Sequence, residues 1–167
     1  MASELIDFLS QNGNAIKAIV ELVTATVALL ALLKGLAEYI GQNALKRFEK
    51  YQDMNHKFCE NAKIQRICDL LDSDRARLRE MPFAEKKDFL GFYEDLALMC
   101  NSGLMNFKVA YYMFGYYIIR SRASDDFLQD VNIDGFYWSL FDCFAKKMKS
   151  FEERAGGKSV DVSSLKF

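Results

Sequence analysis

The chain has 167 residues and a formal net charge of −1, enough sequence for one domain with an appendage but not for two full-sized domains. The near-neutral charge is atypical of nucleic-acid-binding proteins, which usually carry a basic excess, so we expect no binding to duplex DNA or RNA. With a single proline, Pro82, and no Asn-Gly or Asp-Gly pair between alternating apolar runs, the sequence predicts an all-α fold.

A membrane-spanning helix is predicted over residues 15–40. Its centre, Leu22 to Leu33, lacks charged residues, and the extension to the roughly 20 residues that a span requires includes a Lys-Glu pair near each end. Lysine can extend toward lipid headgroups, and a glutamate four residues later can neutralise it. The preceding residues 1–14 lack the positive region of a cleaved signal peptide, so we interpret the segment as an uncleaved anchor in contact with membrane lipid. The alternative is an apolar helix packed inside a soluble oligomer.

The distribution of basic residues predicts the orientation of this anchor. One lysine precedes the apolar centre, whereas four basic residues follow it, at Lys34, Lys46, Arg47 and Lys50. Because basic residues favour the cytoplasmic side of a membrane, we expect a single-pass protein of the inner (cell) membrane whose C-terminal domain is cytoplasmic.

Small residues on one side of the anchor predict that it self-associates. Starting at Lys17 and moving along the anchor by alternating steps of four and three residues selects seven residues that fall within an arc of about 100° of a helical wheel. Small residues in the middle of such a face let two helices approach closely, and charged residues within a membrane usually face a partner helix or water. We therefore expect a homo-oligomer that uses a face formed by Lys17, Glu21, Thr24, Ala28, Ala31, Gly35 and Glu38.

The rest of the chain is expected to form a helical domain. An amphipathic, charge-rich stalk is predicted over residues 41–60. A helical bundle is predicted over residues 61–155, and a loose tail over residues 156–167. The apolar stripe of the first bundle helix is expected at Ile64, Ile67, Leu70 and Leu71.

Three longer helices are predicted in the bundle. The first follows Pro82 and ends near Gly103, and the second begins after Asn106, which can cap it. This second helix is apolar nearly all round, so we expect it to be central, with buried tyrosine rings whose hydroxyls find partners. The last helix is expected over residues 133–153, with Gly156 and Gly157 ending it and with Phe136, Leu140, Phe141, Phe144, Met148 and Phe151 facing inward.

The cysteine and histidine content gives no sign of a metal site or a cofactor. The four cysteines lie in apolar patterns without a CxxC pair, which predicts reduced core thiols at Cys59, Cys68, Cys100 and Cys143. The single histidine, His56, is expected at the surface and cannot form a multi-histidine zinc site. No paired carboxylates or nucleophile-base pair is apparent, so we do not expect an enzyme.

Residues 92–120 resemble an uncharacterised prokaryotic family that joins an N-terminal membrane segment to a small helical domain. The resembling features are the aromatic-Glu-x-Leu-Ala pattern at 93–97, Gly103, and the run from Phe114 to Ile118. The layout is similar to that of membrane effectors of type III CRISPR systems that are activated by cyclic oligoadenylate. This resemblance implies an architecture and an antiviral defence setting, and it assigns no binding residue to this chain.

Two functions are consistent with these features. In the first, the cytoplasmic domain senses a signal, for which a cyclic oligoadenylate is the candidate, and changes the packing of an oligomeric membrane bundle so that the membrane is perturbed. In the second, the protein is a membrane-anchored adaptor that holds a protein partner without a ligand gate.

The first function requires cationic side chains for an anionic ligand. Because the chain has no glycine-rich phosphate loop, Arg and Lys must supply the phosphate contacts. The candidates are Lys63, Arg66, Arg120 and Arg122, with Tyr116 or Tyr117 available to stack on a base. The alternative is that they are ordinary surface charges and core aromatics.

Overall fold

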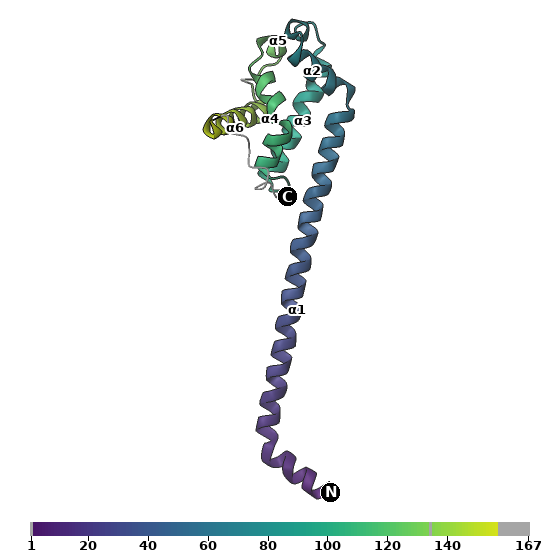
Figure 1. Ribbon diagram of the computed structural model, residues 1–167, viewed down its shortest axis with the longest axis vertical. Coiled ribbons are helices and arrows are strands. Elements are labelled where there is room, and N and C mark those ends of the chain that lie inside the picture. Colours follow the sequence, from purple (N-terminus) through teal and green to yellow (C-terminus); the bar gives the residue numbers. More distant parts are fainter. Residues whose placement is uncertain (1, 134, 157–167) are drawn as a thin grey trace. The chain divides into compact units, whose positions relative to one another are not determined.

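The structure is a computed structural model that describes the backbone of residues 2–12 and all atoms of residues 13–133 and 135–156. The expected tail after Gly156 lies outside these residues. Within them every regular element is a helix, which confirms the all-α prediction (Figure 1). The helices are α1 (Ala2–Glu60), α2 (Ala62–Asp72), the 3₁₀-helix η1 (Arg75–Leu78), α3 (Phe83–Asn101), α4 (Phe107–Arg122), α5 (Asp125–Leu128) and α6 (Ser139–Ala155).

The chain divides into two compact units, residues 1–44 and residues 45–167, which are described separately. The described part of the first unit is the N-terminal portion of α1, up to Ala44, and α1 runs through Gly13 and Gly41 without a break. Glycine costs about 1 kcal/mol relative to alanine in a helix, which does not by itself end one. The helix has an 18-residue window of mean hydropathy 2.2 with no buried residue, so it is long and apolar enough to cross a membrane.

The core of the second unit is formed around α3, which packs against α2, α4 and α6. The buried face of α3 includes Phe89, Phe92 and Tyr93, each with no exposed surface. Met54 and Phe58, near the end of α1, also belong to this core. The stalk predicted over residues 41–60 therefore supplies part of the core at its C-terminal end.

Local sequence signals coincide with several helix ends, of which those at Asn106, Gly103 and Gly156 were predicted. The side chain of Asn61 accepts hydrogen bonds from the backbone N–H groups of Lys63 and Ile64, and Asn106 caps α4 in the same way. Gly103 follows α3 with φ of +72°, and Gly156 ends α6 with φ of +60°. Both backbones lie in the left-handed region that favours glycine.

The prediction for the start of the last helix is wrong. Helix α6 begins at Ser139, and Phe136, expected inward, is 90% exposed. The backbone N–H of Gly135 donates to the carbonyl of Asn132, so this part of the chain forms a turn before the helix. The other inward residues of this helix are buried or half-buried.

Helix α4 contacts α2, α3, α5 and α6, but it is not enclosed on every side as its composition predicted. Tyr112 and Tyr116 are each 54% exposed, whereas Phe114 and Ile118 are buried. A tyrosine hydroxyl can remain in contact with water or with a surface carboxylate, so an aromatic helix face need not be inside.

The prediction of core thiols is correct for Cys68 and wrong for Cys59 and Cys143, which are exposed. Cys59 follows the inward-facing Phe58, and the next residue of a helix is rotated by about 100° away from its neighbour. Cys100 is half-buried, and His56 lies at the surface as predicted.

Two helical glycines are expected to respond in opposite directions to alanine. A Cβ atom at Gly91 of α3 would meet nothing within 4 Å, whereas a Cβ at Gly115 of α4 would lie 2.8 Å from Cδ2 of Tyr111. We expect Gly91→Ala to raise the free energy of unfolding by about 0.5–1 kcal/mol through helix propensity. Gly115→Ala should lower it by about 1–3 kcal/mol, because the Tyr111 ring packs on Phe151 and must shift. Urea unfolding of both variants checks this, and a stabilised Gly115→Ala would contradict the packing at α4.

Candidate functional site

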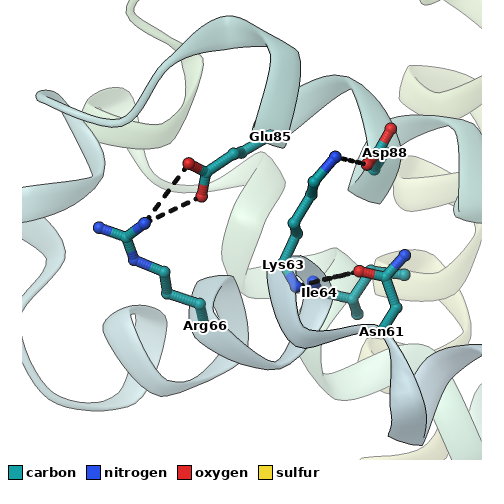
Figure 2. Close-up of polar contacts among 6 residues, drawn as sticks. All are labelled: Asn61, Lys63, Ile64, Arg66, Glu85 and Asp88. Atoms are coloured by element: carbon teal, nitrogen blue, oxygen red, sulfur yellow. Dashed lines mark hydrogen bonds and ion pairs between the residues drawn. The ribbon is translucent and has the colours of Figure 1, made fainter.

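Two of the candidate cations, Lys63 and Arg66, lie on the side of α2 that faces the first turns of α3. Lys63 Nζ donates to Asp88 Oδ2 at 2.6 Å, and Arg66 donates to Glu85 Oε2 at 3.1 Å (Figure 2). The hydrogen bond and charge of Asp88 raise the pKa of Lys63. Both candidates are thus engaged by carboxylates that connect α2 to α3.

Three donors converge on the carboxylate of Asp72 at the end of α2. The hydroxyls of Tyr116 and Tyr117 donate to it at 2.9 and 3.0 Å, and Arg120 donates to it at 2.7 Å. The Arg120 guanidinium also lies 4.7 Å from the centre of the Tyr116 ring, a cation–π arrangement. Burial and the hydrogen bond to Asp72 raise the pKa of Tyr117 to about 12. This group connects α4 to α2.

The last candidate, Arg122, lies between α4 and α6. Its Nε donates to Oδ1 of Asp142, while Lys146 donates to Oδ2 of the same carboxylate. The Asp142 side chain is only 11% exposed. Burial alone would raise the pKa of Asp142, but the hydrogen bonds and charges of Lys146 and Arg122 outweigh it and hold this pKa below its usual value.

The six candidate residues therefore form three groups and not one site. Lys63 and Arg66 lie together, Tyr116 and Tyr117 lie with Arg120, and Arg122 lies apart on the α6 side. Each cation already faces a carboxylate from another helix. An incoming anion would have to compete with these carboxylates for the same donors.

The sequence analysis missed Lys86, whose side chain has no exposed surface. Its Nζ lies 3.5 Å from the carbonyl oxygen of Asp126 and 4.0 Å from the Asp130 carboxylate, with the Phe127 ring nearby. Burial lowers the pKa of Lys86. A signal was present, because Lys86 precedes Phe89 and Tyr93 at the spacing of one buried helix face.

In the first unit the predicted Lys-Glu pairs are formed. Lys17 Nζ lies 4.0 Å from Glu21 and Lys34 Nζ lies 3.9 Å from Glu38. The hydroxyl of Thr24 donates to the carbonyl of Val20 within the same helix. Like the rest of the predicted oligomerisation face, Ala28, Ala31 and Gly35 are exposed in the single chain, as is the apolar opposite side.

The lowered pKa of Asp142 makes part of the domain's stability depend on pH. A carboxyl group whose folded-state pKa is depressed stabilises the fold above its unfolded pKa of about 3.9, and this contribution disappears as the pH falls through the folded value. We expect Asp142→Asn to lower stability at pH 7 by about 1–3 kcal/mol. The measurement is thermal unfolding monitored by circular dichroism. The difference in stability between Asp142→Asn and the unmodified protein should become smaller as the pH is lowered from 7 to 3.

A matched control is Asp53→Asn, which removes an exposed carboxylate paired with Lys50 on one helix. It should change stability by less than about 0.5 kcal/mol at either pH. An Asp142→Asn deficit that stayed constant from pH 7 to pH 3 would contradict the role given to these ion pairs.

No family model matches the chain, and no characterised protein or solved structure is significantly similar to it.

Proposed function

We propose that the protein is an oligomeric, membrane-anchored effector of antiviral defence, whose cytoplasmic helical domain senses a signal and perturbs the membrane. The observation that supports this most strongly is the exposed apolar surface of α1. Leu22 and Leu32, for example, are 68% and 69% exposed, and the entire stretch from residue 13 to residue 42 is exposed. So much apolar surface needs lipid or another apolar helix around it.

Self-association of the anchor gives such a protein a means to act on the bilayer. The paired charges at Lys17, Glu21, Lys34 and Glu38 lie on the same side of the helix as Ala28 and Ala31. Charged residues within a membrane segment are stabilised when they face a helical partner or water. An oligomer built on this face would surround its axis with charged residues at two levels, where water can enter.

The cytoplasmic ion pairs offer a way to couple an anionic signal to helix packing. Each of the four candidate cations holds two helices together through a carboxylate. A phosphate that takes over these donors releases that carboxylate, so it favours a different arrangement of the helices. A ligand shifts a conformational equilibrium only through such a difference in affinity between two arrangements. We propose a cyclic oligoadenylate as this signal.

The test is dye release from vesicles that contain the full-length protein. Cyclic tetra-adenylate should increase release, whereas linear tetra-adenylate should not. Arg120→Gln should abolish the response, because it removes a candidate donor. Arg77→Gln is the matched control, since Arg77 has no ion pair in the described part of the chain and the charge change is the same. Equal responses from the two variants, or none from the unmodified protein, would contradict the proposed gate.

A membrane-anchored adaptor is the second candidate, and the exposed aromatic pair before α6 favours it. Phe136 and Tyr137 are 90% and 82% exposed, and their ring centres lie 6.0 Å apart. Large adjacent aromatics at a surface are typical of the centre of a protein interface. If this function holds, Phe136→Ser with Tyr137→Ser should abolish capture of a protein partner from solubilised membranes, while nucleotides have no effect on the vesicles.

A further inference from the structure

A small pocket lies between the C-terminal part of α4 and the middle of α6. Its volume is about 240 Å³, and its lining residues are Ile119, Arg122, Ala123, Ala145, Lys146 and Lys149. Three of these are aliphatic and three are cationic. The pocket therefore combines apolar walls with a basic rim.

The positive charge at this rim is not balanced. Arg122 and Lys146 share a single carboxylate, Asp142, one on each of its oxygens. Lys149 is exposed and makes no ion pair within the described residues. Three cations and one carboxylate leave an excess of two positive charges, of which the C-terminus of α4 offsets only about half a charge.

We propose that this pocket binds a small phosphomonoester. A phosphate monoester carries about −1.5 to −2 charges near pH 7, which matches the local excess. The volume would hold roughly eight water molecules, enough for a phosphate with one sugar-sized group but too little for a whole cyclic oligonucleotide. The three aliphatic side chains provide contacts for the carbon skeleton that the phosphate carries.

Lys149 is the residue that distinguishes a binding pocket from a structural ion pair. Arg122 and Lys146 already have a carboxylate, so their positions are explained by the fold. Lys149 has no such partner, and it can turn toward a bound phosphate without breaking a contact. The proposal shares Arg122 with the candidates for the signal, but it does not depend on membrane perturbation.

The experiment is isothermal titration of the full-length protein in phosphatidylcholine nanodiscs with ribose 5-phosphate, ribose and inorganic phosphate. Ribose 5-phosphate should bind saturably and more tightly than inorganic phosphate, and ribose should not bind. Lys149→Gln should weaken binding by about tenfold, the effect of one charge-assisted contact of about 1.4 kcal/mol. Lys108→Gln, which makes the same charge change at the other end of α4, should leave the affinity unchanged.

Several results would overturn the proposal: no saturable binding by the unmodified protein, equal affinities for ribose 5-phosphate and inorganic phosphate, or equal losses in the two lysine variants. The source of the phosphomonoester is found by repeating the titration in nanodiscs that contain phosphatidic acid. A lower apparent affinity there identifies the lipid headgroup as the occupant, and an unchanged one identifies a soluble ligand. Dye release triggered by cyclic tetra-adenylate without ribose 5-phosphate binding would refute the pocket and leave the effector function standing.

Discussion

Replacing Phe114 with alanine is expected to lower the free energy of unfolding of the helical domain by about 3–5 kcal/mol. Phe114 is 1% exposed, and its ring lies 5.3 Å from that of Phe58 and 5.4 Å from that of Phe92. These three rings join α4, the end of α1 and α3. The substitution removes a large apolar side chain and leaves a cavity that its aromatic neighbours can fill only in part.

The measurement is urea unfolding of the full-length protein in mild detergent, followed by fluorescence of Trp138, the single tryptophan of the chain. Phe136→Ala provides the control, because the same atoms are removed from a side chain that is 90% exposed. This control should change stability by less than about 0.5 kcal/mol. Similar losses in the two variants would mean that the three-ring cluster does not form the core.

Replacing Ala28 and Ala31 together with leucine is expected to abolish self-association of the anchor. Both residues lie in the middle of the small-residue face, where close approach of two helix backbones depends on small side chains. Leucine adds three carbon atoms at each position and moves the backbones apart. Light scattering of the detergent-solubilised protein should then report a lower mass for the double variant than for the unmodified chain.

The matched control places the same substitutions on the other side of the helix. Ala15 and Ala37 lie about 170° and about 150° around the helical wheel from the centre of the face, so Ala15→Leu with Ala37→Leu should leave the oligomeric mass unchanged. An oligomer retained with leucine at Ala28 and Ala31 would refute the proposed face.

Signals confined to a few neighbouring residues were sufficient to predict much of the fold. The predicted cap at Asn106 and the predicted helix end at Gly156 involve only contacts between residues close in sequence. The stripe of α2 follows from helical periodicity, and its residues are buried. The start of α6 could not be predicted from helical periodicity, because Phe136 has the same spacing as the inward-facing apolar residues of α6 although it lies in the turn before the helix.

The candidate site depends on contacts that a single sequence does not reveal. Arg120 meets Asp72 from 48 residues away, and Arg66 meets Glu85 from 19 residues away. The basic residues could be selected from the sequence, but the carboxylates with which they form ion pairs could not. Lys149 was missed because an unpaired lysine at a pocket rim looks, in sequence, like any other surface lysine.

The most direct test of the account is the location of the helical domain relative to the membrane. Cys59 and Cys143 are exposed, whereas burial raises the pKa of Cys68 to about 12 and that of Cys100 to about 11, so the first two should react with a membrane-impermeant maleimide. We expect the protein to stay with the membrane fraction after alkaline carbonate extraction. Labelling should occur in inverted inner-membrane vesicles and not in intact spheroplasts. Labelling of intact spheroplasts, or recovery of the protein in the soluble fraction, would contradict a single-pass anchor with a cytoplasmic domain.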